Sequence, residues 1–211
     1  MPINLFRRKI TEPALDGETT VTLLVGLGNP GREYRDSRHN AGFMIIDRLA
    51  ADLGVKLTRV QNRALTGSGV IGGAKIVLAK PQTFMNLSGE AVSGLVRFYK
   101  IPHEKLLVIH DDIDLPFGVL RMRPGGGSAG QKGVQSIIER IGTQDFPRLR
   151  FGIGRPAGSK GGAGYVLNHF HAEEQKELPF LMDAAAAAAR LFVSDGLEAA
   201  MNRYNGSLFE E

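Results

Sequence analysis

Residues 21–42 read VTLLVGLGNPGREYRDSRHNAG, and the prediction of the fold starts from this stretch. The apolar run VTLLV predicts a buried strand that ends at Gly26. Gly26, Gly28 and Gly31 match the G-x-G-x-x-G spacing of a dinucleotide-binding turn, but that turn requires a helix to begin at its third glycine. The segment REYRDSRHN follows instead, and it has no helical period. We therefore interpret the glycines as a tight turn that lets the backbone approach a ligand, and not as a cofactor site.

Strand-like and helix-like segments alternate along the rest of the chain. Strands are predicted over residues 64–70, 74–80, 106–112, 118–124 and 149–156, and helices over 43–53, 88–100, 134–141, 172–194 and 197–204. Ser88 is the expected N-cap of the second of these helices. Its expected inner face carries Ala91, Leu95 and Phe98. The alternation predicts an α/β sandwich with helices on both faces of one sheet.

The composition is that of an ordinary globular protein, with 43% hydrophobic and 23% charged residues among 211. Cys is absent, which excludes disulfides, thiolate catalysis and zinc–thiolate sites and fits a cytoplasmic location. The net charge of +4 and the pI near 9.5 favour an anionic partner such as nucleic acid. No run reaches the roughly 20 apolar residues of a membrane span. We expect residues 1–20 to be a flexible tail and residues 21–211 to be one domain.

Polar side chains follow several of the predicted strands. In α/β sheets, ligands bind where the carboxyl ends of the strands meet. This rule gathers four residues from distant parts of the sequence, namely Asn29, His39, Asn86 and Asp111. An imidazole can take a proton from water near neutral pH, a carboxylate can fix its tautomer, and asparagine amides can donate hydrogen bonds to an oxyanion. The set favours water-mediated hydrolysis of an activated carbonyl such as an ester.

Other motifs indicate different chemistry. The acidic segment HDDID, residues 110–114, is typical of a magnesium site, but GGGSAGQKG misses the spacing of a P-loop because Lys132 comes one place late. The same loop contains G-x-S-x-G around Ser128, so a serine esterase with His169 or His171 as base stays an alternative. The segment before this loop, LRMRP, is a poor match to the buried strand that such a nucleophile requires. We interpret His169 and His171 as a solvated surface pair, not a metal site.

The chain resembles bacterial peptidyl-tRNA hydrolases in four long motifs that occur in the same order: GLGNPGREYRDSRHNAGF, KPQTFMNLSGEAV, HDDIDLPFGVLRMRPGGGSAG and FPRLRFGIGRP. The resemblance extends from about Val21 to Tyr204. It implies a monomer without metal, cofactor or obligate protein partner, built on a mixed, mostly parallel twisted sheet. It also implies a substrate, peptidyl-tRNA, whose ester between the peptide and the terminal adenosine is hydrolysed to recycle tRNA from stalled translation.

The resemblance implies roles for the residues at the predicted sheet edge. His39 corresponds to the base that activates water, and Asp111 to the carboxylate that orients this base. Asn29 and Asn86 match the asparagines that hold the substrate, and Met85 lies on the wall of the peptide groove.

Further residues are implied to bind the tRNA. Tyr34 matches a tyrosine beside the tRNA 3′ end, and Arg123 and Arg150 match basic residues that grip the 5′ phosphate, a role for which Arg is well suited. The sequence departs from the family at Gln131 and Lys132, where members commonly have His-Asn. Lys132 can still donate a hydrogen bond and adds a positive charge, so we include it among the substrate-binding residues.

Two functional classes remain open beside the serine esterase. Some relatives in plant organelles act as RNA-binding splicing cofactors without useful hydrolase activity. The presence of His39, Asp111 and both asparagines favours the enzyme. The glycine-rich segments 125–130 and 158–164 are candidates for movable flaps over the groove.

Overall fold

The computed structural model describes residues 20–155 and 163–209. The predicted tail over residues 1–20 therefore lies outside the described residues except for Thr20, as does most of the glycine-rich segment 158–164. Within the described ranges, no helix is long and apolar enough to span a membrane.

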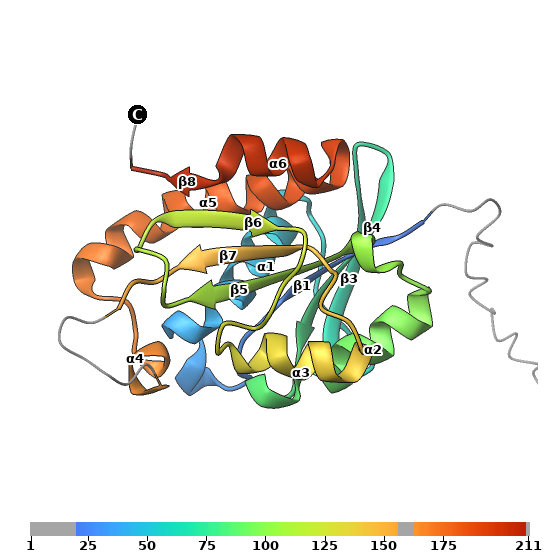
Figure 1. The fold of residues 1–211 in the computed structure, drawn as a ribbon, viewed down its shortest axis with the longest axis horizontal. Helices are drawn as coiled ribbons and strands as arrows, with labels where there is room; N and C mark the ends of the chain where they lie inside the picture. Colours follow the sequence, from blue (N-terminus) through green and yellow to red (C-terminus); the bar gives the residue numbers. More distant parts are fainter. Residues whose placement is uncertain (1–19, 156–162, 210–211) are drawn as a thin grey trace, which may run out of the picture.

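A single mixed sheet forms the centre of the molecule (Figure 1). The strands of the described residues are β1 Thr22–Gly26, β2 Arg59–Gln61, β3 Ala64–Ile71, β4 Ala74–Pro81, β5 Leu106–Asp112, β6 Val119–Arg123, β7 Arg148–Gly152 and β8 Gly206–Ser207. They are ordered β2-β3-β4-β1-β5-β7-β6-β8. The neighbours β4, β1, β5 and β7 are parallel, whereas the outer strands pair antiparallel. Every residue of β1 and β5 is buried, as expected for parallel strands that are covered on both faces.

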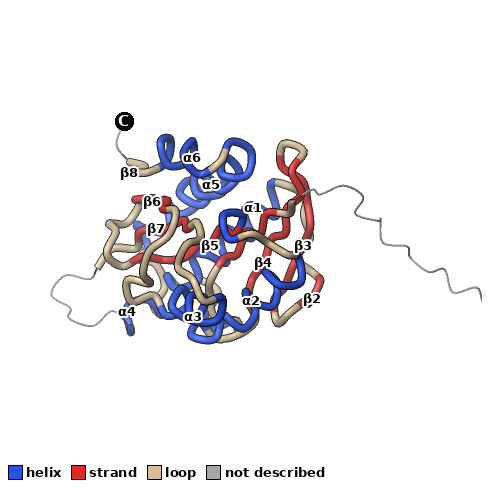
Figure 2. The backbone as a smooth tube through the Cα atoms, turned by 45° about the vertical axis from the view of Figure 1, so that its right-hand side comes forward, coloured by secondary structure: helices blue, strands red, loops and turns tan. Residues whose placement is uncertain are grey.

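Helices cover both faces of this sheet, as the sequence predicts. Their bounds are α1 Ala41–Asp52, α2 Ser88–Tyr99, α3 Lys132–Ile141, α4 Ala163–Leu167, α5 Ala172–Asp195 and α6 Leu197–Tyr204. Helices α1, α5 and α6 lie on one side and α2 and α3 on the other (Figure 2). Side chains that alternate along β5 fill two separate cores, with Leu107 and Ile109 facing α1 and α5, and Leu106 and Val108 facing α2 and α3.

Two expectations for α2 were wrong. Ser88 is the first residue of the helix and not its N-cap, because the 3₁₀ turn η3 (Met85–Leu87) leads directly into it. The Ser88 hydroxyl instead donates to the carbonyl of Met85 (2.8 Å) and joins the turn to the helix. Phe98 is 58% exposed, although Ala91 and Leu95 are fully buried as predicted. At this end of the helix the inward position passes to Tyr99, which is only partly exposed and packs against the core of α2 and α3.

The segment after β1 forms short turns in place of a helix. Gly31, with φ of 118°, precedes the 3₁₀ turn η1 (Arg32–Tyr34), and a second turn, η2 (Arg38–Asn40), leads into α1. A Cβ atom on Gly26 would lie 2.1 Å from the carbonyl oxygen of Gly42, so this glycine permits the close packing of α1 on β1. The first glycine of the spacing that suggests a dinucleotide site thus serves the packing of a helix on a strand.

Candidate active site

A pocket of about 590 Å³ lies where β1, β4 and β5 reach their carboxyl ends. Six of the nine residues singled out from the sequence line it, namely Asn29, His39, Met85, Asn86, Asp111 and Lys132. The other three, Tyr34, Arg123 and Arg150, are not among its lining residues. The rule that gathers ligand-binding side chains at the carboxyl ends of parallel strands therefore locates this pocket from the sequence.

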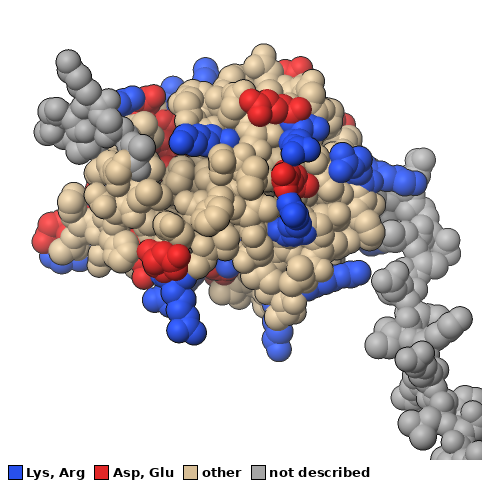
Figure 3. Space-filling view, turned by 90° about the horizontal axis from the view of Figure 1, so that it is seen from below, with Lys and Arg blue, Asp and Glu red and all other residues tan. Residues whose placement is uncertain are grey.

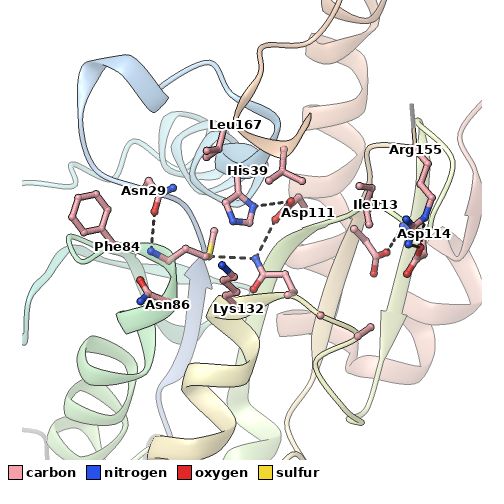
Figure 4. Close-up of a pocket in the computed structure, with 16 residues that line it drawn as sticks. Asn29, His39, Phe84, Asn86, Asp111, Ile113, Asp114, Lys132, Arg155 and Leu167 are labelled. Carbon is pink, nitrogen blue, oxygen red and sulfur yellow. Dashed lines mark hydrogen bonds and ion pairs between the residues drawn. The ribbon is translucent and has the colours of Figure 1, made fainter. Parts of the chain in front are cut away.

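His39 and Asp111 form the polar centre of the pocket (Figure 4). His39 comes from η2, and Asp111 is the penultimate residue of β5. The Nδ1 atom of His39 lies 2.8 Å from Oδ2 of Asp111, with side-chain exposures of 12% and 3%. Because a carboxylate accepts hydrogen bonds, this contact places the proton on Nδ1 and leaves the lone pair of Nε2 as the basic group. The arrangement matches a general base held in one tautomer by a buried acid.

Gln131 is a residue of this site to which the sequence analysis assigned no role. Its Nε2 atom donates to Oδ1 of Asp111 (3.1 Å), so both carboxylate oxygens have a partner. Gln131 is also the N-cap of α3, since its Oε1 accepts from the backbone N–H of Val134 (2.9 Å). Gln is not among the residues that are usually favoured at an N-cap, so the sequence offers no clear signal for this position.

Asn29 is fixed from two directions. Its side-chain oxygen accepts from the backbone N–H of Met85 (2.8 Å). Its backbone N–H and carbonyl are both bound by the side chain of Asn40, at 2.8 Å and 3.0 Å. Because the oxygen faces Met85, the group that Asn29 can offer to a ligand is its NH₂, a neutral hydrogen-bond donor. Asn86 is exposed on the same rim, on the neighbouring turn η3.

The walls of the pocket are partly apolar. Phe84 and Leu167 are 57% and 44% exposed, although both are large hydrophobic residues. They stand on different sides of His39 in Figure 4, with Phe84 before η3 and Leu167 at the end of α4. Met85 and Ile113 add further apolar surface. Exposed apolar side chains around a polar centre are typical of a binding groove for a ligand with apolar parts.

Three arginines, Arg123, Arg148 and Arg150, lie outside the pocket on β6 and β7. Arg123 is exposed at the end of β6, whereas Arg150 is largely buried and donates through Nε to Oδ2 of Asp112 (2.6 Å). Arg148 is buried, and its guanidinium donates to the carbonyls of Gly127 (2.6 Å) and Gln144 (3.2 Å). Burial, followed by the nearby charges of Arg123 and Arg150, lowers the pKa of Arg148 to about 10, so it still carries a positive charge at neutral pH.

These arginines form a local concentration of positive charge that would attract an anion. Seen from the side of α2 and α3, Lys and Arg side chains stand at many points of the molecular surface (Figure 3). Tyr34, the remaining predicted residue, is half-buried at the end of η1, on the loop that leads to His39.

The alternative motifs do not form sites of their own in the described residues. Ser128 lies in the loop between β6 and α3, with no buried strand leading directly into it, and does not line the pocket. His169 and His171 are exposed, as predicted, and His171 is the N-cap of α5. Within residues 20–155 and 163–209, no group of three or more His, Asp or Glu side chains is arranged to hold a metal ion.

Several known proteins with similar sequences and structures are peptidyl-tRNA hydrolases. The family model for peptidyl-tRNA hydrolase matches residues 23–211. Peptidyl-tRNA hydrolase of Moorella thermoacetica is 51% identical over 187 residues, which cover 88% of this chain and 98% of that protein. A chloroplastic peptidyl-tRNA hydrolase of Arabidopsis thaliana is 52% identical over 175 residues, which cover 82% of this chain but 61% of the longer plant protein. The crystal structure of peptidyl-tRNA hydrolase from Acinetobacter baumannii has a TM-score of 0.83 at 39% identity, covering 90% of this chain and 96% of that one.

Proposed function

The chain belongs to the peptidyl-tRNA hydrolase family, and we propose that it hydrolyses the ester bond that joins a peptide to the 3′ end of tRNA. The observation that carries this proposal is the 2.8 Å contact between Nδ1 of His39 and Oδ2 of Asp111 on the wall of the pocket. This contact orients an imidazole whose Nε2 can remove a proton from water. The reaction frees the tRNA for further rounds of translation.

The proposed reaction uses one base and one orienting acid. Nε2 of His39 takes a proton from water, and the resulting hydroxide attacks the ester carbonyl carbon. Asp111 accepts a hydrogen bond from the Nδ1–H of His39 and stabilises the imidazolium that forms. The bond between this carbon and the ribose oxygen of the tRNA then breaks, and the imidazolium returns the proton to the leaving oxygen. Positioned general-base catalysis of this kind contributes roughly 10²–10⁴ in rate.

The developing oxyanion and the peptide have separate places in this proposal. The NH₂ group of Asn29, whose oxygen is held by Met85, is the donor for the oxyanion. Asn86 and Lys132, exposed at the rim, bind polar groups of the substrate. The apolar side chains of Phe84, Met85 and Leu167 contact the peptide.

The tRNA body lies beyond the pocket in this proposal. Arg123 and Arg150 bind its 5′ phosphate, supported by the cluster of positive charge that they form with Arg148. Because Arg150 is already paired with Asp112, Arg123 is the more accessible of the two. Tyr34, on the loop before His39, lies beside the 3′ end of the tRNA.

The test is hydrolysis of an N-blocked aminoacyl-tRNA by the purified protein and by His39→Ala, with a chelator present. The parent is expected to release the blocked amino acid, and His39→Ala is expected to lose at least a hundredfold in rate while still binding tRNA. His103→Ala changes an exposed histidine on the turn η4 (His103–Lys105) and serves as the matched control. A parent protein that binds the tRNA without cleaving it would refute the hydrolase and leave the RNA-binding module.

We also propose that residues 21–211 are the catalytic domain and that the protein acts as a monomer in the cytoplasm. Two similar plant proteins are named for the chloroplast and the mitochondrion, so the location is to be tested by fractionation of the source cells. Sedimentation equilibrium tests the monomer, and a mass twice the 22.8 kDa of the chain would contradict it.

A further inference from the structure

The side chain of Gln131 uses both ends of its amide in contacts that reach the centre of the pocket. Its Oε1 accepts from the backbone N–H of Val134 (2.9 Å) at the start of α3. Its Nε2 donates to Oδ1 of Asp111 (3.1 Å) and lies 3.3 Å from the sulfur of Met85. The N–H of Val134 can only donate, so it determines which end of the amide faces Asp111. The N-terminus of α3 therefore sets the direction in which Gln131 presents its NH₂ group.

We propose that Gln131 is a positioning residue that fixes the carboxylate of Asp111 for its contact with His39. Asp111 is 3% exposed, and each of its oxygens has its own donor, Gln131 on Oδ1 and His39 on Oδ2. A carboxylate that is bound at both oxygens by groups from different elements is held against rotation. The inference rests on the proposed function, since it assigns Gln131 a role in the reaction of that site.

The amide matters because it is a neutral donor that does not titrate. It can hold Oδ1 of Asp111 at any pH without adding a charge beside His39. Among the neighbouring groups, Lys132 follows on α3 and carries a charge, and the pair of Asp114 and Arg155 lies farther along the same pocket. Within the described residues, the Asp111 carboxylate is hydrogen-bonded by Gln131 and His39 and not by these charged groups.

The substitution Gln131→Glu separates the two contacts of the side chain, the cap on Val134 and the hydrogen bond to Asp111. A glutamate can still accept from the N–H of Val134 and cap α3, but it cannot donate to Asp111 and places a like charge beside it. We expect Gln131→Glu to keep the fold, to reduce kcat about ten- to a hundredfold with little change in KM, and to move the acidic limb of the kcat profile to higher pH. Gln131→Met, which loses both contacts, is expected to lower kcat as well and also to reduce the Tm.

A paired exchange tests the hydrogen-bond direction itself. In Asp111→Asn, the retained NH₂ of Gln131 attracts the new amide oxygen, so the Asn NH₂ faces Nδ1 of His39 and favours the tautomer that protonates Nε2. In Asp111→Asn with Gln131→Glu, the carboxylate of Glu accepts from the Asn NH₂, and the Asn oxygen again faces Nδ1. We expect the double variant to hydrolyse at least tenfold faster than Asp111→Asn alone.

The decisive experiment measures kcat, KM and pH profiles of these variants with N-blocked aminoacyl-tRNA, together with NMR titration of the His39 ring, assigned with His39→Ala. A raised titration midpoint of His39 in Gln131→Glu, with rescue in the double variant, supports the proposal. Parent-like kcat and titration in Gln131→Glu, or losses that simply multiply in the double variant, would overturn it and leave Gln131 as a helix cap only. Because the NMR titration needs no turnover, an inactive parent would refute the proposed function without leaving the role of Gln131 undecided.

Discussion

The side chain of Asn40 binds both polar backbone groups of Asn29, accepting from its N–H (2.8 Å) and donating to its carbonyl (3.0 Å). Asn40 is the last residue of η2 and directly follows His39. The turn that carries the proposed base is thereby joined to the loop that carries the proposed oxyanion donor. The relative placement of His39 and Asn29 depends on this pair of hydrogen bonds.

Asn40→Ala is expected to impair hydrolysis although Asn40 does not line the pocket. The change removes two buried hydrogen bonds and leaves the N–H and carbonyl of Asn29 without partners, at a cost of about 1–3 kcal/mol in unfolding free energy. Displacement of Asn29 from the oxyanion should lower kcat roughly tenfold or more, because small errors in position are costly in catalysis. Urea denaturation and steady-state hydrolysis measure the two effects.

Asn202→Ala, an exposed position on α6, is the matched control and should change neither quantity. Equal kcat in Asn40→Ala and the parent would show that Asn29 keeps its position without the two hydrogen bonds from Asn40.

Much of the site follows from local sequence patterns. The strand-like runs before Gly26 and up to Asp112 identify where parallel strands end, and this is sufficient to gather His39, Asp111 and Asn29. The role of Gln131 could not be predicted in the same way. It depends on which end of the Gln131 amide, at the start of α3, faces the carboxylate of Asp111 on β5. Lys132, the next residue along the chain, lines the pocket and stays a predicted substrate-binding residue.

Short elements were missed for a related reason. Helix α4 has only five residues, AGYVL, which is too short to show a helical period. Its position depends on distant contacts, since the ring of Tyr165 stacks on the guanidinium of Arg38 at 4.3 Å. Leu167, which α4 brings to the pocket, was for this reason absent from the predicted site.

Arg123→Gln is expected to weaken tRNA binding through the loss of one phosphate contact. The slope of log K against log salt concentration should decrease by about one, while stability stays within about 0.5 kcal/mol because the residue is exposed. Filter binding in a His39→Ala background, at several salt concentrations, gives the slope without interference from cleavage. Arg203→Gln on α6, which covers the opposite face of the sheet, is the control.

Arg150→Gln should behave differently from Arg123→Gln. The side chains of Arg150 and Asp112 are only 14% and 6% exposed, so the change leaves a buried carboxylate without its partner. A loss of about 3–5 kcal/mol in unfolding free energy is expected beside any loss of binding. An unchanged salt slope in both variants would argue against phosphate binding at this cluster.

Arg38→Met is expected to destabilise the protein strongly. The Arg38 side chain is fully buried, pairs with Glu174, donates to the carbonyl of His169 and stacks on the rings of Tyr165 and Phe170. Removing one partner of such an ion pair costs about 3–5 kcal/mol, because the other charge remains without compensation. Urea denaturation should show this loss.

The double variant Arg38→Met with Glu174→Gln should lose less stability than the sum of the two single variants, since no unpaired charge remains. Arg35→Met is the control, because the pair of Arg35 and Asp36 is 79% and 59% exposed and contributes at most about 1 kcal/mol. A loss in Arg38→Met no larger than in this control would contradict the structural role of Arg38.

Acid is expected to destabilise the fold through His110. Burial, reinforced by the charge of Arg148 and opposed by Asp111 and Asp112, lowers the pKa of this histidine below its usual value of 6.5. Its Nδ1 donates to the backbone carbonyl of Asp111 (2.7 Å), and its Nε2 is buried without a partner among the described residues. Below about pH 6.5 the unfolded chain binds a proton that the folded protein excludes, so stability falls as the pH is lowered, by up to about 1.4 kcal/mol per pH unit.

His110→Asn removes this titration while its NH₂ can still donate to the carbonyl of Asp111. Between pH 7.5 and 5.5, the unfolding free energy of this variant should therefore decline less steeply than that of the parent, even if the smaller side chain lowers stability uniformly. His103→Asn, at an exposed position, should retain the steep decline of the parent. An equally steep decline of the unfolding free energy in His110→Asn and the parent would contradict this prediction. It would mean that His110 binds its proton equally well in the folded and unfolded states, and that other groups cause the acid sensitivity.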